Sequence, residues 1–225
     1  MLEIVKTSDG SNTIFNSEVG ENYHSHHGAL QESKHVFVKS GLQYFLDKTE
    51  TKQISILEVG FGTGLNFLLS ADYCSTESIH LDYTGIEAYP LTNEMISQTG
   101  YDEYVSTDLW QEFIKHYPAT LQNPIELNKT CRLQIANTRL MEFQSNQKFD
   151  VIYFDAFAAT YQPEMWDEAA ITHTLQFLKP GGVFVTYAIT GNLKRIVKSL
   201  GLKVEKAPGA PGKREMLRAY YPTDI

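Results

Sequence analysis

The residue best placed for chemistry is Asp155, which follows the apolar segment FDVIYF at residues 149–154. Such a run predicts a buried strand, so the carboxylate would emerge into a pocket of low dielectric constant. There it would orient an amine nucleophile, accept its proton and stabilise developing positive charge. Asp155 is therefore the candidate catalytic residue, and an aspartate that only caps a loop is the competing interpretation.

Three alternating glycines, Gly60, Gly62 and Gly64, follow the apolar run at residues 54–59. Glycine permits a sharp turn and a close approach between backbone and ligand, and the helical composition of residues 65–73 places a helix N-terminus behind the turn. The spacing G-x-G-x-G differs from the G-x-G-x-x-G of dinucleotide-binding proteins. With an acid before it, the loop looks like the first motif of S-adenosylmethionine-dependent methyltransferases, and a purely structural turn is the alternative.

Polar residues also end two further predicted strands. Residues 79–87 alternate and end in Glu87, which is placed to accept hydrogen bonds from ribose hydroxyls. Residues 131–136 predict a third strand, and the polar residues Asn137 and Thr138 after it suit contacts to an adenine. Ligands of open α/β sheets bind beyond the carboxyl ends of the strands. We therefore expect these residues to meet the glycine loop and the candidate catalytic aspartate at one edge.

Strand and helix patterns alternate along most of the chain. Helices are predicted between the strands, including one over residues 138–147, while Pro118 is assigned to a loop. Residues 183–188 predict a fifth strand, and residues 202–206 and 215–221 bracket a Pro/Gly loop as an antiparallel pair. The predicted fold class is α/β, with a mostly parallel sheet and a C-terminal antiparallel hairpin.

The length of the chain is that of a protein with one α/β domain. A chain of 225 residues can bury a full core, and we expect residues 1–50 to form an N-terminal arm and lead-in elements packed on a core of residues 51–225. The N-terminus resembles no leader peptide and no apolar run reaches the length of a membrane span, so we expect a cytoplasmic protein that does not contact membranes. The histidines His24, His26 and His27 lack companion ligands, so no metal is expected.

The net charge of −8 argues against general nucleic-acid binding but leaves room for a local basic face. The segment from residue 203 to residue 218 concentrates positive charge. It contains Lys203, Lys206, Lys213, Arg214 and Arg218, against Glu205 and Glu215. Contact with phosphates is the functional interpretation, and a solvated basic hairpin is an equally good one.

Several segments together resemble the methyltransferase domain of the MnmC family, bacterial enzymes that finish 5-methylaminomethyl-2-thiouridine at the wobble position of tRNA. These segments are YHSHHGALQES (23–33), EVGFGTGLNF (58–67), Glu87 with Pro90-Leu91-Thr92, DAFAATYQPEMW (155–166), KPGG (179–182) and KREM (213–216). They run through nearly the whole chain. The DAFAATYQPEMW and KREM segments are much more specific than the glycine loop.

The resemblance implies a Rossmann-like class I methyltransferase fold, S-adenosyl-L-methionine as cofactor and tRNA as substrate. The reaction would be N-methylation of the aminomethyl group of 5-aminomethyl-2-thiouridine, with Asp155 catalytic. Implied cofactor contacts are Glu58, Gly60, Phe61, Gly62, Gly64, Asn66, Glu87, Ala88, Asn137, Thr138 and Asp155. Implied contacts to tRNA are Phe157, Lys213 and Arg214.

Two departures from the family qualify this expectation. Asn137 stands where many members have aspartate, which leaves the adenine contact open. The chain stops soon after KREM and has no second glycine fingerprint, so we expect no flavin-dependent oxidase activity, and a separate enzyme is one source of the aminomethyl substrate. Other functions that fit the residues are a small-molecule N-methyltransferase, an aminopropyltransferase-like enzyme and a non-catalytic cofactor-binding scaffold.

Overall fold

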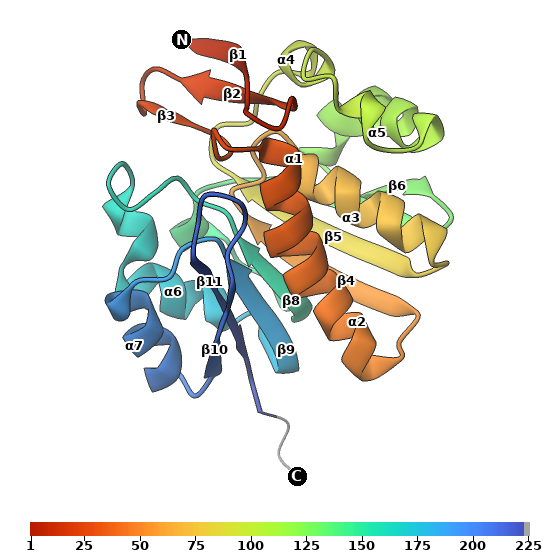
Figure 1. The fold of residues 1–225 in the computed structure, drawn as a ribbon. Coiled ribbons are helices and arrows are strands. Elements are labelled where there is room, and N and C mark those ends of the chain that lie inside the picture. The colour runs from red at the N-terminus through yellow and green to blue at the C-terminus, as the bar shows by residue number, and fades with distance from the viewer. Residues whose placement is uncertain (223–225) are drawn as a thin grey trace.

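The computed structural model describes residues 1–222, which form a large sheet with helices on both faces and a small sheet at one end (Figure 1). The strands are β1 (Leu2–Lys6), β2 (Asn12–Asn16), β3 (Glu21–Asn22), β4 (Gln53–Val59), β5 (His80–Glu87), β6 (Ile125–Asn128), β7 (Cys131–Asn137), β8 (Phe149–Phe154), β9 (Leu178–Thr186), β10 (Lys203–Pro208) and β11 (Glu215–Tyr220). The helices are α1 (Ala29–Glu32), η1 (Ser33–Gln43), α2 (Tyr44–Thr49), α3 (Leu65–Thr76), α4 (Asn93–Ser97), α5 (Thr107–Thr120), α6 (Glu168–Leu175) and α7 (Gly191–Ser199), with short 3-10 turns η2 (Tyr101–Glu103), η3 (Leu140–Glu142) and η4 (Pro163–Trp166).

The large sheet has the strand order β10-β11-β9-β8-β4-β5-β7-β6. Strands β9, β8, β4, β5 and β7 are parallel neighbours, whereas β11 is antiparallel to both β9 and β10. The predicted parallel sheet with a C-terminal antiparallel hairpin is therefore confirmed. Strand β6, which the sequence patterns did not predict, adds an antiparallel strand at the opposite edge.

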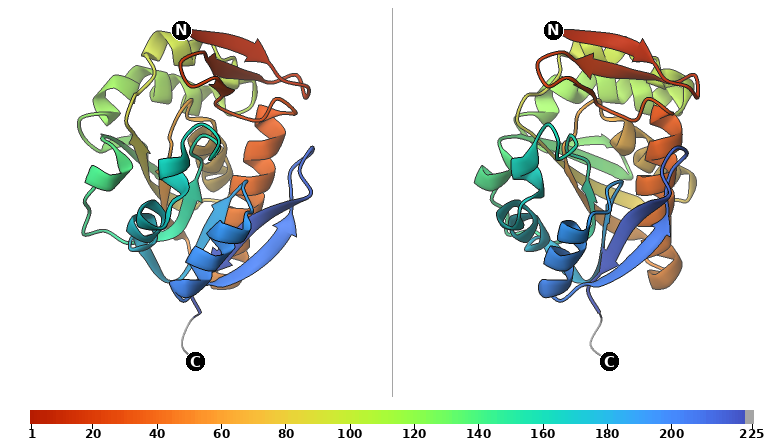
Figure 2. Two further views of the ribbon diagram at one scale, coloured as in Figure 1. Left: turned by 90° about the vertical axis from the view of Figure 1, so that its left-hand side faces the viewer. Right: turned by 60° about the vertical axis from the view of Figure 1, so that its left-hand side comes forward.

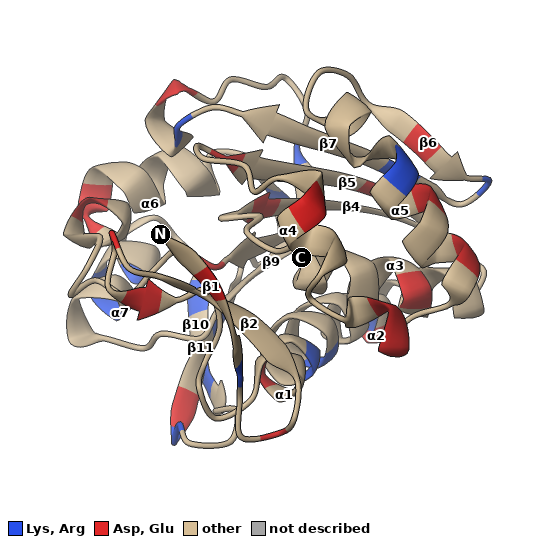
Figure 3. Cartoon of the chain, turned by 90° about the horizontal axis from the view of Figure 1, so that it is seen from above, with Lys and Arg blue, Asp and Glu red and all other residues tan. Residues whose placement is uncertain are grey.

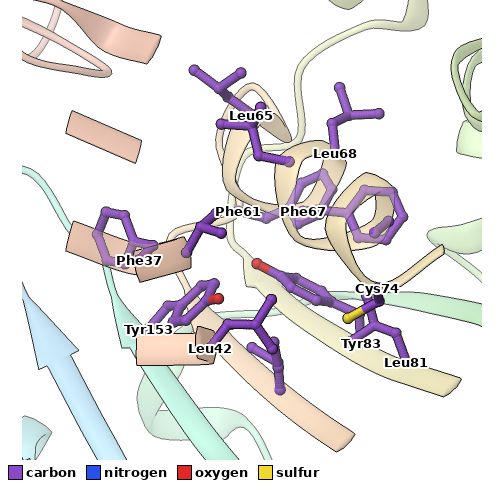
Figure 4. Packing of buried hydrophobic residues seen from close by; sticks show 14 of the residues in the cluster. Phe37, Leu42, Phe61, Leu65, Phe67, Leu68, Cys74, Leu81, Tyr83 and Tyr153 are labelled. Carbon is purple, nitrogen blue, oxygen red and sulfur yellow. The ribbon is translucent and has the colours of Figure 1, made fainter. Parts of the chain in front are cut away.

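Both faces of the central strands are buried, which explains why their sequences are almost continuously apolar. In β4, Ile54 and Ile56 face the side that is covered by η1, α3 and α5, while Leu57 and Val59 face the side covered by α6 and α7. Figure 4 shows the first of these two cores, where aromatic and aliphatic side chains fill the space between sheet and helices. The two cores hold the carboxyl ends of the strands in fixed positions.

The segment that precedes β4 is one long helix, built from α1, η1 and α2, and the middle part is π-helical. Val36 and Phe37 are buried on its inner side, where it crosses β8, β9 and α3. The first turn of this long helix, α1, ends in the buried Glu32.

The small sheet of β1, β2 and β3 lies over the edge of the large sheet where α4 and α5 begin (Figure 2). Asn12 anchors it, because the Asn12 amide donates to the carbonyl of Thr99 at 2.9 Å and the Asn12 carbonyl accepts from the Tyr101 hydroxyl at 3.1 Å. This sheet carries Glu21 and leads into Tyr23. In residues 1–222, no helix is long and apolar enough to cross a membrane.

Two local predictions were wrong. Residues 138–147 contain only the short turn η3 instead of a helix, because Phe143 takes extended backbone angles and packs its ring on Phe177. Pro118 lies inside α5 rather than in a loop. Near the end of a helix a proline removes a single backbone hydrogen bond, and the preceding Tyr117 is held by burial and by its hydrogen bond to the carbonyl of Leu91.

Candidate active site

The carboxyl ends of β4, β5, β7 and β8 bring the predicted site residues to one edge of the sheet. Val59 pairs with Phe154 in the register of β4 and β8, so the glycine loop and Asp155 leave the sheet side by side. Glu87 pairs with Asn137 in the register of β5 and β7. The parallel topology alone therefore places the glycine loop, Glu87, Asn137 and Asp155 in one neighbourhood.

The glycine loop is tight because other backbone segments pass close to it. Gly60 has a φ of 84°, and a Cβ atom there would lie 2.5 Å from the carbonyl oxygen of Asp155. Gly62 has a φ of 53°, and a Cβ atom there would lie 2.9 Å from the Tyr23 ring. Side chains other than hydrogen are strained at both positions. The loop thus forms a cradle with no room for side chains at these two positions, and its Gly60 and Phe61 amides both donate to the carbonyl of Ile86 at 3.1 Å.

Glu87 ties the loop to the end of β5. Its Oε2 accepts a hydrogen bond from the Gly62 amide at 2.9 Å, and its Oε1 accepts one from the Tyr89 amide at 3.0 Å. Burial raises the pKa of the Glu87 carboxyl. Each oxygen keeps a second lone pair for a ligand hydroxyl. Beside it, Ala88 and Thr138 are half-buried and Asn137 is exposed.

Three of the implied cofactor contacts, Glu58, Phe61 and Asn66, have side chains inside the protein. The Phe61 ring is 2% exposed and lies under α3 against Phe67 (Figure 4), in the space that a Cβ atom on Gly85 would need. Glu58 is completely buried on the same face of β4.

Glu58 instead belongs to a buried hydrogen-bonded chain that ends at Asp155. The Tyr83 hydroxyl donates to Glu58 Oε2 at 2.7 Å, and Asn66 Nδ2 donates to Glu58 Oε1 and to Asp155 Oδ2, both at 2.8 Å. Burial raises the pKa of Glu58 well above its ordinary range, and the nearby Asp155 charge adds to this effect. Asn66, on α3, therefore fixes the orientation of the candidate catalytic carboxylate.

Asp155 is a much weaker acid than an ordinary aspartate. Burial raises its pKa to about 8, and the charge of Glu32 acts in the same direction. The hydrogen bond from Asn66 and the charge of Lys213 lower the pKa of Asp155 without cancelling the rise. A carboxylate with this pKa accepts a proton more readily than an ordinary aspartate, because its basicity approaches that of an aliphatic amine, and the accepting form predominates above about pH 8.

A pocket of about 380 Å³ opens in front of Asp155. Aromatic side chains from four segments line it, and Glu21, Glu32 and Lys213 supply charge. The aromatic residues are Phe15, Tyr23, Phe157, Tyr161 and Tyr187. The pocket is therefore shaped by flat apolar surfaces and carries more acidic than basic side chains.

The structure separates the three residues that the resemblance assigns to tRNA. Phe157 lines the pocket, with its ring centroid 5.0 Å from that of Tyr23. Lys213 also lines the pocket, and its Nζ lies 3.6 Å from Glu32 Oε1. Arg214 is exposed on the turn between β10 and β11 and does not line the pocket.

Sequence reasoning missed Glu21, Glu32 and Tyr187 as pocket residues. Glu32 lies within the YHSHHGALQES segment, so the resemblance held a signal for it, whereas Glu21 and Tyr187 carried none. That segment and the residues just after it support the C-terminal hairpin: the backbone of Gly212 packs on the His27 ring, and His35 Nε2 lies 2.6 Å from the carbonyl oxygen of Pro208. In residues 1–222, no group of three or more His, Cys, Asp or Glu side chains is arranged to hold a metal ion.

A G-x-G-x-G loop after the central strand β4, an acid at the end of β5, and a strand β11 inserted between β9 and β10 define an S-adenosylmethionine-dependent methyltransferase with a Rossmann-like fold. Residues 104–222 match the model of a family described as S-adenosyl-L-methionine-dependent methyltransferase, and the chain belongs to this family.

Relatives and solved structures agree with this assignment. The chain is 31% identical over 212 residues to the tRNA 5-methylaminomethyl-2-thiouridine biosynthesis bifunctional protein MnmC of Leptospira interrogans, with 88% of this chain and 32% of that protein covered. The MnmC protein of Aromatoleum aromaticum is 28% identical over 226 residues, with 96% and 34% covered. The chain thus spans about one third of these relatives. The crystal structure of MnmC2 from Aquifex aeolicus shares the fold, with a TM-score of 0.80, 23% identity, and 100% of this chain and 73% of that chain covered.

Proposed function

We propose that the protein methylates the primary amine of a 5-aminomethyl group on the wobble uridine of tRNA, giving the 5-methylaminomethyl group. The similarity to MnmC proteins supports this substrate. The observation that carries the proposal is Asp155, a carboxylate whose pKa is raised to about 8 in an acidic and aromatic pocket. Such a pocket suits a flat base that bears a positively charged amine.

The cofactor fits the glycine cradle described above. S-adenosyl-L-methionine supplies, when bound, a methyl group on a positively charged sulfur. The glycine loop would allow the cofactor to approach the backbone closely, and the remaining lone pairs of Glu87 with the polar Asn137 and Thr138 would accept hydrogen bonds from its nucleoside part or donate them to it. Asn66 and Glu58 support this side of the site through Asp155 and not through an exposed side chain.

Asp155 would make the substrate amine nucleophilic. An aliphatic amine has a pKa of about 10 and reaches the site as an ammonium ion. One N–H bond would break as the proton passes to the Asp155 carboxylate, which becomes a neutral carboxylic acid, and the nitrogen would keep the electron pair and become a neutral, nucleophilic amine. Because the pKa of Asp155 is about 8, this transfer is only moderately uphill.

Aromatic side chains would position the base. Tyr23 and Phe157 meet edge to face at one side of the pocket, and the half-exposed Tyr161 lies at another. A nucleobase stacks well on such rings, which contribute roughly 1–3 kcal/mol per base in single-stranded RNA recognition. Phe157 follows Asp155 by two residues, so the same loop would orient both the base and the proton acceptor.

A basic groove on α7 would bind the phosphates of tRNA. It has a volume of about 610 Å³ and is lined by Lys194, Arg195 and Lys198 of α7 together with Lys206 of β10. Helix α7 itself contains no acid, and Figure 3 marks the charged residues along the chain. In the hairpin, by contrast, Arg218 is ion-paired with Glu205 and Lys213 lies against Glu32. The docking surface would therefore be centred on α7, with the exposed Arg214 as a further candidate for a phosphate contact.

The proposal is tested with tRNA that carries 5-aminomethyluridine at the wobble position. In a single-turnover assay with saturating cofactor, the wild-type protein should convert it to 5-methylaminomethyluridine, detected by nucleoside mass spectrometry. Asp155→Asn should lose roughly 10²-fold or more in rate, the range for one positioned acid–base group, while its affinity for the cofactor changes much less. Methylation of free small amines but not of this tRNA would contradict the proposal, as would a wild-type rate in Asp155→Asn.

The proposed reaction needs a primary amine on the uridine, so another reaction must first produce that amine.

A further inference from the structure

The pocket in front of Asp155 contains more negative charge than one proton acceptor requires. Glu21 comes from β3, Glu32 from α1 and Asp155 from the end of β8. Lys213, in the turn between β10 and β11, is the single lysine or arginine among the pocket-lining residues that the structure describes. The turn that carries it lies beside the start of α1 (Figure 2).

Glu32 is the unusual member of this group. It is 5% exposed, and its Oε1 lies 3.6 Å from Lys213 Nζ. Its Oε2 is buried and has no hydrogen-bond partner within residues 1–222. A buried carboxylate oxygen without a donor is costly, and native proteins rarely leave one unsatisfied. Glu32 lines the pocket together with Ser25, and burial raises the pKa of its carboxyl, while the charge of Lys213 and the neighbouring Ser25 lower it.

Lys213 shows what kind of donor this part of the pocket accepts. Besides its contact with Glu32, its ammonium group lies 3.9 Å from the centroid of the Tyr187 ring. A carboxylate on one side and an aromatic face on the other form a favourable site for an ammonium ion. The Tyr187 ring is fixed next to the catalytic loop, because its hydroxyl donates to the carbonyl of Ala156 at 2.8 Å.

We propose that Glu32 is a second substrate-contacting residue, whose carboxylate receives the ammonium group of the substrate beside Asp155. The proposal rests on the proposed function and adds the group that recognises the charge of the substrate. Glu32 holds the ammonium ion, Lys213 shields Glu32 Oε1, and Asp155 takes the proton. The pocket would therefore select an amine over a neutral group of the same shape.

The charges around Asp155 allow Glu32 and Lys213 to be tested against each other. Facing groups are Glu32 of α1, Glu21 of β3, Lys213 of the hairpin turn, Tyr187 after β9 and, through Asn66, Glu58 of β4. The same pocket is also lined by the titratable side chains of Tyr23, His24, His26, His27 and Tyr161. Glu32 and Glu21 raise the pKa of Asp155 and Lys213 lowers it. Removing Glu32 or Lys213 should consequently have effects of opposite sign, whereas a structural defect would act in one direction.

Equilibrium binding without cofactor gives the first measurement. Anticodon stem-loops with 5-aminomethyluridine or 5-hydroxymethyluridine are titrated by calorimetry into the wild type, Glu32→Gln and Lys213→Gln. The wild type should prefer the amine. Glu32→Gln should reduce this preference about tenfold, the usual loss for one charged hydrogen bond, and Lys213→Gln should increase it. Glu18→Gln, at an exposed acid outside the pocket, is the matched control.

The second measurement needs neither substrate nor turnover. Titration of the Asp155 carboxyl by carbon NMR should show a lower pKa in Glu32→Gln and a higher pKa in Lys213→Gln. Shifts in the same direction in both variants, or an unchanged amine preference in Glu32→Gln, would overturn the assignment of Glu32. Opposite shifts and preferences in a protein that does not methylate the aminomethyl tRNA would uphold the ammonium site and reject the proposed function instead.

Discussion

Asn66 and Asp155 are joined by a hydrogen bond of 2.8 Å, from the amide Nδ2 on α3 to the carboxylate Oδ2 after β8. The same Nδ2 donates to Glu58 Oε1, so one buried amide holds two acids. This hydrogen bond lowers the pKa of Asp155 against the effect of burial. Asn66 thus positions the carboxylate and keeps it available as a base.

Asn66→Ala should shift the pH dependence of methyl transfer. Without the amide, the pKa of Asp155 rises further, so the acid limb of the pH–rate profile should move to higher pH and the rate at neutral pH should fall roughly tenfold. Ser70→Ala is the matched control, because Ser70 is buried on the same helix but bonds to Tyr153. An Asn66→Ala profile that overlays the wild type would exclude this positioning role.

Asp155→Asn should make the protein more stable at high pH. The pKa of this carboxyl is about 8 in the folded protein and near 4 when unfolded, so folding opposes its ionisation. Wild-type stability is therefore lost as the pH rises from about 4 to about 8, by on the order of a few kcal/mol. Asparagine avoids this loss.

The difference is measured by thermal unfolding without cofactor. Asp155→Asn should melt on the order of 5 °C above the wild type at pH 8.5 and at nearly the same temperature at pH 4. Equal melting temperatures at both pH values would mean that the carboxyl ionises in the folded protein as easily as in water.

Gly62→Val should abolish cofactor binding and leave the fold intact. A Cβ atom at position 62 would press on the Tyr23 ring, and the φ of 53° disfavours a branched side chain. Calorimetry should show a loss of S-adenosylmethionine affinity of at least about tenfold with an unchanged circular dichroism spectrum. Gly191→Val is the control, because a Cβ atom there has no neighbour within 4 Å. Wild-type affinity in Gly62→Val would remove the loop from the cofactor site.

The combined substitution of Lys194, Arg195 and Lys198 by alanine should weaken tRNA binding and flatten its salt dependence. Each lost phosphate contact should reduce the log–log slope by roughly one, measured by fluorescence anisotropy across a salt series. Cofactor affinity should not change. Lys115 and Lys129, near the β6 edge, provide a control pair of alanine substitutions. An unaltered slope in the triple variant would show that the α7 groove faces solvent only.

The sequence by itself determined the frame of the site. Apolar runs that end in Gly60, Glu87, Asn137 and Asp155 predict parallel strands, and parallel strands place their carboxyl ends at one edge whatever the details of packing. The glycine spacing and the acid after a very apolar strand are local patterns. They could be recognised without knowledge of which distant segments touch, and the fold that they predicted was confirmed.

Only the tertiary structure decided how the pocket is charged and which side chains face it. Lys213 was expected on an exposed basic hairpin. It lies in the pocket against Glu32 instead, because the hairpin turn packs on the His27 ring and on α1. Phe61 sits in the glycine loop but turns its ring into the core. Glu32 and Tyr187 line the same pocket although they are more than a hundred residues apart in the sequence. Encounters of this kind depend on the packing of helices and turns over the sheet, which no local periodicity encodes.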